Sequence, residues 1–356
     1  MRASKVLPHE IFWREHFCFL ERRGYRLRPR YDPLHVPSRE HRRWCDVSDP
    51  YPEDEIAMLR PSVLDAIRMS DNSPVVLRRA ATWSDEVPIL RRLERLRSDP
   101  RNRTAPLLDI FPLPDSDDEL LIVMPLLRVY YDPPFSCPRQ VLHALVQLLE
   151  MMQFLHDHNI AHRDFCTFNI MLDPTDLFPE GFHFVMPRSK ADGQADGLNY
   201  RDRAAVPSIR YFLIDFGLST QLAHEHALVT GVYGADKTVP ELSWDKPYNP
   251  FKVDVYQFGH VIMHDMVEVS GNHSRTFFDL ADYIQLYDGL DFLRPLAESM
   301  TQSDPFQRPT ATEALEHVQN ILASLPSTEL QKDIWPTTYS RLHFSMRPRP
   351  ARRSCC

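Results

Sequence analysis

Apolar and polar residues in the second half of the chain follow the periods of helices and short buried strands. Apolar side chains recur every three or four residues between 141 and 155, which predicts an amphipathic helix. Two short apolar runs, at 170–172 and 211–214, predict buried strands. The stretch between them, 173–208, is rich in Pro, Gly and Asp and predicts a surface loop. A capping-box sequence that begins at Thr310 predicts the start of a final helix.

The first half carries a weaker pattern of the β type. Short apolar runs at 63–67 and 75–77 predict two strands, because the polar stretch between them has the residues of a hairpin turn. The segment 86–96 has the period of a helix, and 120–124 is a continuous apolar strand. These elements predict a small β-rich unit over residues 55–126.

The patterns divide the chain into four parts. Residues 1–50 are expected to be an N-terminal extension with a helix at 10–23. Residues 51–126 are expected to form a small β-rich lobe, and 127–325 a larger and mainly helical lobe. Residues 326–356 form a basic tail that is expected to be flexible. The expected fold class is therefore α+β with two unequal lobes.

Composition narrows the functional classes. The chain has 356 residues, of which 43% are hydrophobic, enough for a sizeable core. Its formal net charge of −8 argues against nucleic-acid binding. No apolar run approaches the roughly 20 residues that a membrane helix needs, and no secretory signal is expected. Six cysteines without a CxxC pair fit a reducing compartment, so an intracellular protein, cytoplasmic or nuclear, is expected.

The most specific signal is an ordered series of short motifs. In chain order they are His162–Asn169 (HRDFCTFN), Asp215–Gly217 (DFG), Val239–Glu241 (VPE), Asp254 and Arg308–Thr310 (RPT). An isolated HRD is often a buried ion pair and an isolated DFG is often a turn, but the first motif follows a predicted helix and the second a predicted strand. Asp164, Asn169 and Asp215 would then converge at neighbouring strand ends, where two oxygen ligands and a proton acceptor suit a hard cation such as Mg²⁺.

This series resembles the catalytic half of the eukaryotic protein kinase family. The resemblance covers about 55–325 and is stronger in the second lobe, and a looser one points to a fungal branch of kinase-like proteins. It implies a bilobal protein-kinase-like fold that uses ATP and Mg²⁺. By motif match, Asp164 would accept the proton of a substrate hydroxyl, while Asn169 and Asp215 would bind the metal.

The same resemblance implies structural roles for other motif residues. Glu241 and Arg308 would form a buried ion pair at the end of the activation segment, and Asp254 would hold the catalytic loop. The residues implied for a hydrophobic spine are His162, Phe216 and Leu90, which makes His162 a core residue rather than a base. In the family, Arg163 can pair with a phosphorylated residue of the segment 215–241, although it could equally make only structural bonds. The hydroxyls in that segment are those of Ser219, Thr220, Thr230, Tyr233 and Thr238.

The first lobe departs from the family pattern where ATP phosphates would bind. The stretch 58–64, which aligns with the glycine-rich loop, has no glycine, and Pro61 lacks an N–H group, so poor phosphate binding is expected there. Arg78 stands where the family has a lysine, and no lysine occurs between Lys5 and Lys190.

Glu86 aligns with the family's helix glutamate and is expected to pair with Arg78. The alternative is an exposed glutamate in a first helical turn. In the catalytic loop, Cys166 and Phe168 stand where kinases place a basic residue. Cys166 is better explained as a small buried side chain than as a nucleophile.

The resemblance also implies residues that would contact the adenine of ATP. Val76 would lie above the base and Met171 below it. Residues 124–127 would form the hinge between the lobes, in which Met124 begins the segment and Leu127 supplies the main backbone donor. Pro125 removes one donor from this hinge.

Two functions remain open at this point. The first is an ATP- and Mg²⁺-dependent protein kinase of the serine/threonine type, slow or unusual, because all three site residues are present. The second is a pseudokinase that binds nucleotide or a partner without turnover, because the glycines, the lysine and the catalytic-loop cation are missing. A small-molecule phosphotransferase is disfavoured, since that class has HGD in place of HRD. The protein partner is unspecified, and membrane tethering through Cys355 and Cys356 is the less favoured reading of the basic tail.

Overall fold

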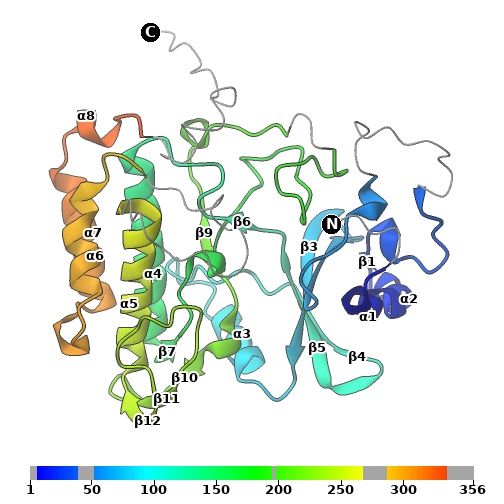
Figure 1. The fold of residues 1–356 in the computed structure, drawn as a ribbon, viewed down its shortest axis with the longest axis horizontal. Helices are drawn as coiled ribbons and strands as arrows, with labels where there is room; N and C mark the ends of the chain where they lie inside the picture. The colour runs from blue at the N-terminus through cyan, green and yellow to red at the C-terminus, as the bar shows by residue number, and fades with distance from the viewer. Residues whose placement is uncertain (1–5, 39–51, 195–197, 268–286, 335–356) are drawn as a thin grey trace. The chain divides into compact units, whose positions relative to one another are not determined.

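The computed structural model describes most of the chain in two compact units. The described residues are 6–38, 52–194, 198–267 and 287–334 (Figure 1). Unit 1 comprises residues 1–87, 105–127 and 174–201, and unit 2 comprises residues 88–104, 128–173 and 202–356. Cys355 and Cys356 lie outside the described residues. Within the described part, no helix combines the length and the apolar character needed to cross a membrane.

A five-stranded antiparallel sheet is the framework of unit 1, in the order β1-β2-β3-β5-β4. Its strands are β1 Tyr25–Arg26, β2 Val63–Arg68, β3 Ser73–Ala81, β4 Asp109–Leu113 and β5 Ser116–Pro125. The strands predicted at 63–67, 75–77 and 120–124 lie within β2, β3 and β5. Strand β4 was not predicted, because Pro112 interrupts its short apolar pattern.

Residues of the N-terminal segment are part of the core of unit 1. The helix predicted at 10–23 consists of two short helices, α1 Ile11–Glu15 and α2 Phe17–Arg22. Trp13 and Tyr31 are fully buried in the same apolar cluster as Leu64 and Leu77 of the sheet. The segment therefore completes the hydrophobic core, and residues 1–50 are not a simple appendage of the lobe where the structure describes them.

The insert at 173–208 differs from the predicted surface loop. Its described residues contain no α-helix and no strand, but several of its side chains are buried. Leu177, Phe178 and Phe182 are apolar anchors, and His183 is only 2% exposed. Because these apolar residues are spaced irregularly in a polar stretch, their burial left no periodic signal.

Unit 2 is mainly helical. Its helices are most of α3 Glu86–Arg95, α4 Pro138–Asp157, α5 Pro250–Ile262, α6 Arg294–Met300, α7 Ala311–Ser324 and α8 Ser327–Leu330 (Figure 1). Its strands are β6 Arg128–Val129, β7 Ile160–Ala161, β8 Ile170–Leu172, β9 Tyr211–Leu213, β10 Thr220–Gln221, β11 Val229–Gly231 and β12 Ser243–Tyr248. The amphipathic helix predicted at 141–155 lies within α4, and the capping box of Thr310 and Glu313 begins α7 as predicted.

Candidate functional site

Residues of α5 hold the loop between β7 and β8 in place through hydrogen bonds. The Asp254 carboxylate accepts the backbone N–H of His162 at 2.9 Å and that of Arg163 at 2.6 Å. Gln257, one turn further along α5, accepts the N–H of Phe165 at 2.9 Å and donates to the carbonyl of Arg163 at 3.2 Å. Arg163 has a φ of +66°, a conformation that is unfavourable for a residue with a side chain. The bonds from α5 stabilise this turn, and the role predicted for Asp254 is confirmed.

Asp164 and Asn169 lie in direct contact in this loop. The Asn169 side-chain Nδ2 donates to the backbone carbonyl of Asp164 at 2.9 Å and to its carboxylate Oδ2 at 3.0 Å. The other carboxylate oxygen, Oδ1, accepts the backbone N–H of Ala235 at 2.7 Å. These two bonds fix the carboxylate, and each oxygen retains a second lone pair for a substrate hydroxyl.

Asp215 is brought to the same place by the pairing of β8 with β9. The N–H of Ile214 donates to the carbonyl of Asn169 at 3.0 Å, so Asp215 follows directly on a bond to the neighbouring strand. Its φ of 63° turns the chain sharply, and its side chain accepts the N–H of Gly217 at 3.4 Å. The three residues predicted for the site are therefore neighbours within unit 2.

The residue set fits a magnesium ion that is completed by substrate. Because Nδ2 of Asn169 is the atom that donates to Asp164, its Oδ1 is left as an oxygen ligand. Asp215 offers a carboxylate. Among the described residues, no group of three or more His, Cys, Asp and Glu side chains could hold a metal alone. Mg²⁺ commonly binds one or two protein ligands and takes the rest from phosphates and water.

One contact of the predicted spine, between His162 and Phe216, and the predicted ion pair are present in unit 2. His162 is fully buried, its ring lies edge-on to Phe216 at 4.9 Å, and its Nε2 donates to the Ile214 carbonyl at 3.0 Å. It is a core residue, as predicted. Arg308 is 2% exposed and makes two parallel bonds, of 2.6 and 2.8 Å, to the carboxylate of Glu241. This confirms the predicted buried pair.

Cys166 is a poor nucleophile in this structure. Burial, followed by the charge of neighbouring Asp164, raises the pKa of its thiol to about 12. The reactive form of cysteine is the thiolate, which is scarce far below that pKa. Cys166 was expected to be a small buried side chain; it is only partly buried, but its raised pKa agrees with a residue that is not a nucleophile.

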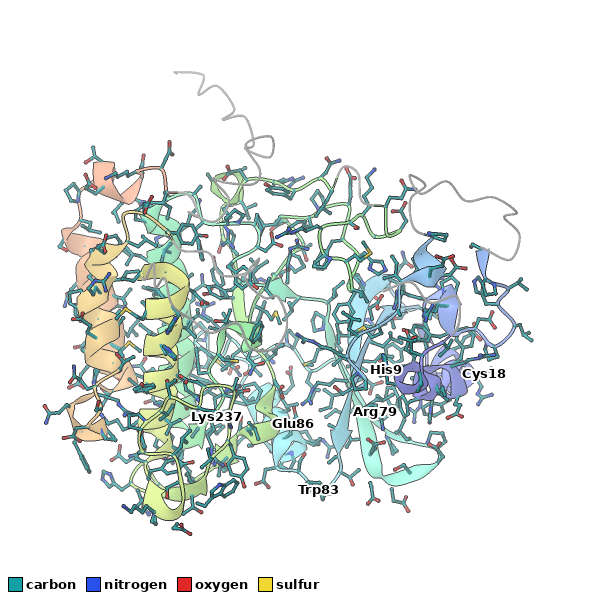
Figure 2. All side chains as sticks on the ribbon, viewed as in Figure 1. His9, Cys18, Arg79, Trp83, Glu86 and Lys237 are labelled. Atoms are coloured by element: carbon teal, nitrogen blue, oxygen red, sulfur yellow. The ribbon has the colours of Figure 1, made fainter. Side chains whose placement is uncertain are left out.

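In unit 1, Arg78 and Glu86 form an ion pair. Glu86 begins α3, is 3% exposed and is labelled in Figure 2. It is therefore not the exposed glutamate of the alternative reading. Arg79, also labelled there, lies on the other face of β3, where it binds Glu119 and covers the ring of Phe12 at 3.9 Å. Because side chains alternate along a strand, the two arginines lie on opposite faces of the sheet.

The residues predicted for adenine binding are divided between the two units. Val76 of β3 is directly opposite Met124 of β5, so these two share one face of the unit 1 sheet. Leu127 is the last residue of the segment 105–127 of the same unit, and it follows Leu126, whose N–H donates to the carbonyl of Pro74 at 3.1 Å. Met171 lies in β8 of unit 2.

The loop that replaces a glycine-rich turn is tied down by residues that sequence reasoning missed. The Met58 N–H donates to the carboxylate of Glu10 at 2.8 Å, and the Met58 carbonyl accepts His9 Nε2 at 2.6 Å. Residues 59–62 are exposed, and the N–H of Arg79 closes the turn on the Ser62 carbonyl at 2.8 Å. The one indication of this contact in the sequence is that the acidic residue Glu10 lies directly before an apolar run. The loop does not fit a phosphate cradle, because its first N–H is already used and Pro61 has none.

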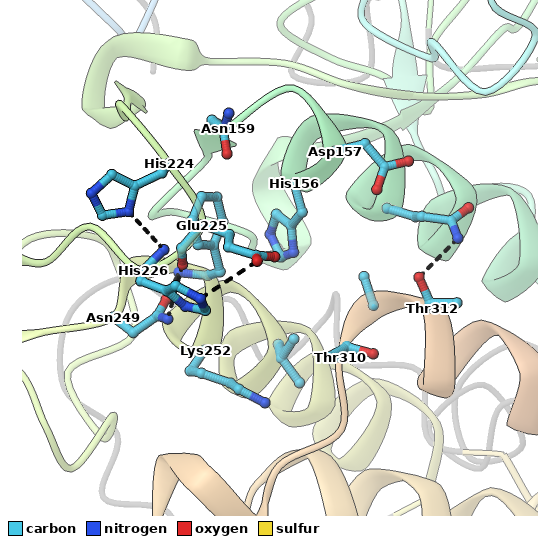
Figure 3. Close-up of a pocket in the computed structure, with 14 residues that line it drawn as sticks. His156, Asp157, Asn159, His224, Glu225, His226, Asn249, Lys252, Thr310 and Thr312 are labelled. Atoms are coloured by element: carbon cyan, nitrogen blue, oxygen red, sulfur yellow. Dashed lines mark hydrogen bonds and ion pairs between the residues drawn. The ribbon is translucent and has the colours of Figure 1, made fainter.

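A cavity of about 790 Å³ in unit 2 lies apart from these residues (Figure 3). It is bordered by the start of α5 and the start of α7, but both helix ends are capped, by Asn249 and by Thr310 with Glu313. Lys252, which also lines it, donates to the carbonyl of Arg308 at 2.6 Å. Several of its polar groups are therefore already hydrogen-bonded, and none of the candidate site residues lines it.

Comparisons with known proteins point to one family. A family model described as "Protein kinase domain" matches residues 125–319, more than half of the chain. The "Dual specificity protein kinase CLK2" of Mus musculus and that of Homo sapiens are each 31% identical to the chain over 126 residues. The alignment covers 35% of this chain and 21% of each relative, so the chain matches only about a fifth of the relatives' length.

Proposed function

Because the chain belongs to the protein kinase domain family, we propose that it transfers the γ-phosphoryl group of ATP to a hydroxyl of a protein, serine or threonine in the first instance. The observation that supports this proposal is that Asp164 is hydrogen-bonded to Asn169, and Asp215 directly follows Ile214, whose N–H is bonded to the carbonyl of Asn169. A bound Mg²⁺ would neutralise charge on the phosphates, and the amide oxygen of Asn169 and the carboxylate of Asp215 would hold it.

The chemistry asked of the chain itself is positioning and one proton. The substrate oxygen forms a bond to the γ-phosphorus as the bond to the β-phosphate oxygen of ATP breaks, and ADP leaves. Asp164 accepts the hydroxyl proton. Its two bonds, to Asn169 and to the N–H of Ala235, keep the carboxylate in one orientation before substrate binds.

We expect the rate of phosphoryl transfer to be low. The residues two and four after Asp164 are Cys166 and Phe168, so no cation from these positions stabilises the charge that develops on the phosphoryl group. In unit 1, the exposed loop 59–62 offers little to the phosphates. Arg78, paired with Glu86, retains a positive charge but not the compact ammonium of lysine.

A second function is favoured by unit 1 taken alone. The same loop and Arg78 suit a pseudokinase that binds nucleotide or a partner without turnover. The property that distinguishes the two proposals is phosphoryl transfer, because nucleotide binding is compatible with both.

The deciding experiment is a transfer assay on the full chain with labelled ATP, Mg²⁺ or Mn²⁺, and a generic protein substrate. We expect a slow signal that Asp164→Asn abolishes, while Asp176→Asn, a change at an exposed aspartate of unit 1, leaves it unchanged. Thermal stabilisation by nucleotide without any transfer would support the pseudokinase. A signal of full strength in Asp164→Asn would refute the assignment of the proton acceptor.

Arg78→Lys tests the departure in β3. We expect nucleotide affinity or transfer rate to rise, because the ammonium is more compact than the guanidinium. A fall in both would show instead that Arg78 is adapted to this site.

A further inference from the structure

The ring of Tyr233 is packed against Arg163. The Arg163 guanidinium carbon lies 4.9 Å from the centre of the Tyr233 ring, a cation–π distance. The ring of Trp244, on β12, meets Tyr233 edge-on at 5.3 Å. Tyr233 is thus held between the catalytic loop and the two-stranded sheet of β11 and β12.

The backbone beneath the ring is shaped to accept it. Gly231 has a φ of +115°, and a Cβ atom there would lie at or below 3.0 Å from three atoms of the Tyr233 ring. Only glycine allows both that conformation and that contact. The carbonyl of Gly231 is held in turn by the Tyr248 hydroxyl at 2.5 Å. The position of the ring is therefore built into the local backbone.

Arg163 joins several parts of the activation segment. Its guanidinium donates to the Thr220 hydroxyl at 3.0 Å and to the Thr230 carbonyl at 3.4 Å, while the ring of Tyr233 covers one face. The backbone of Arg163 is fixed by Asp254, as described above. The segment is thus attached at three points to a rigid residue, and all three partners are uncharged.

We propose that Tyr233 is a positioning residue that holds Arg163 and the segment 229–235 in place without a phosphoryl group. Ala235 lies in this segment, and its backbone N–H donates to the carboxylate of Asp164. An ordered segment therefore helps to orient Asp164. The link to catalysis rests on the proposed function. The ordering itself does not, because it concerns contacts within unit 2 whether or not transfer occurs.

Hydrogen–deuterium exchange on the full chain tests the proposal. The protein is treated with phosphatase, and mass spectrometry verifies that no phosphate remains. We expect the amides of 229–235 to be protected equally before and after treatment. Tyr233→Phe should keep this protection, because the described contacts of Tyr233 involve its ring. Tyr233→Leu should raise the exchange rate of these amides roughly tenfold, the size expected for losing one cation–π and one aromatic contact.

Two controls separate positioning from general damage. Amides of α4 and α7 should be unchanged in Tyr233→Leu. Tyr200→Leu replaces an equally exposed tyrosine of unit 1, 38% against 39%, and should leave 229–235 protected. If phosphatase treatment of the wild type exposes the segment, a phosphoryl group is required and the proposal is overturned.

Other outcomes also decide the question. Protection that survives in Tyr233→Leu would show that the ring does not order the segment. Loss in Tyr233→Phe equal to that in Tyr233→Leu would assign the role to the hydroxyl. Where transfer activity is found, Tyr233→Phe should retain it and Tyr233→Leu should lower it. Where no activity is found, the exchange data still test the ordering, so failure of the proposed function is distinguishable.

Discussion

Glu10→Gln removes the charge at the centre of a buried network in unit 1. The Glu10 side chain is fully buried and accepts bonds from five donors. Arg30 Nη2 and the Leu7 N–H donate to Oε2, while Arg30 Nε, the Tyr31 hydroxyl and the Met58 N–H donate to Oε1, all between 2.7 and 3.0 Å. Burial alone would raise the pKa of Glu10, but the bonds and the charge of Arg30 outweigh it and lower that pKa.

The loss of stability expected for Glu10→Gln follows from these hydrogen bonds. Glutamine has one oxygen and one NH₂ group, and either orientation turns the NH₂ toward at least two donors. Arg30, itself 5% exposed, would lose the negative charge of Glu10. Removing one member of a buried pair typically costs about 3–5 kcal/mol, and we expect unit 1 to lose an amount in this range. The loop at Met58 should open with it, because the same carboxylate holds its N–H.

Native-state hydrogen exchange of β2 and β3 measures this loss without assuming that both units unfold together. Glu15→Gln, at an exposed position of α1, is the matched control and should change stability by less than about 0.5 kcal/mol. Adding Arg30→Met to Glu10→Gln should recover about 1–2 kcal/mol relative to the sum of the single changes. A loss below about 1 kcal/mol in Glu10→Gln would refute the reasoning.

The pH dependence of stability is a separate test of the direction of the Glu10 pKa shift. A carboxylate whose pKa is lowered by folding stabilises the fold above its unfolded pKa, and that contribution is lost as the pH falls through the folded pKa. The difference between wild type and Glu10→Gln should therefore be constant above the ordinary value of 4.5 and should shrink below it. A difference that grows in acid would contradict the lowered pKa.

Three further predictions concern unit 2. Gly234→Ala should lower any transfer rate at least tenfold with little change in nucleotide binding. The reason is that a Cβ at this position would lie 2.6 Å from the carbonyl oxygen of Arg163, next to Asp164, and steady-state kinetics measure the effect. Glu241→Gln should cost about 3–5 kcal/mol in denaturant unfolding by leaving Arg308 buried without its charge partner, and an unchanged midpoint would contradict it. At pH 8, peptide mass spectrometry after alkylation should find exposed Cys18 labelled and Cys166 unlabelled, and rapid labelling of Cys166 would contradict its raised pKa.

The site in unit 2 could be predicted because its information is local. Each of the two motifs, HRDFCTFN and DFG, holds its site residues within a few positions of one another. The apolar runs at 170–172 and 211–214 predict two strands, and the motifs lie at the ends of these strands. The hydrogen bonds of Asp254 and the pair of Glu241 with Arg308 were also predicted, because each belongs to a motif with a known structural role. These last two contacts span 92 and 67 residues, so they were predicted from the family resemblance and not from spacing along the chain.

The packing of unit 1 could not be predicted, because it depends on contacts between distant parts of the chain. Glu10 bonds to Arg30 and to Met58, which is 48 residues away. His183, in the insert, lies 3.3 Å from a guanidinium nitrogen of Arg28, across 155 residues. Both arginines were visible in the sequence as part of an Arg-rich stretch, but nothing in their spacing identified their acidic or imidazole partners.

The same contrast explains why the two proposed functions are hard to separate by inspection. In unit 2, Arg163 stays in an unfavourable conformation only because Asp254 and Gln257 hold it, and that arrangement aims Asp164. In unit 1, the N–H of Met58, which a phosphate could have used, is bonded to Glu10 instead. Unit 2 holds Asp164 in one orientation, whereas in unit 1 the first N–H of the loop is already bonded to Glu10, so unit 2 favours the proposed transferase and unit 1 favours the pseudokinase.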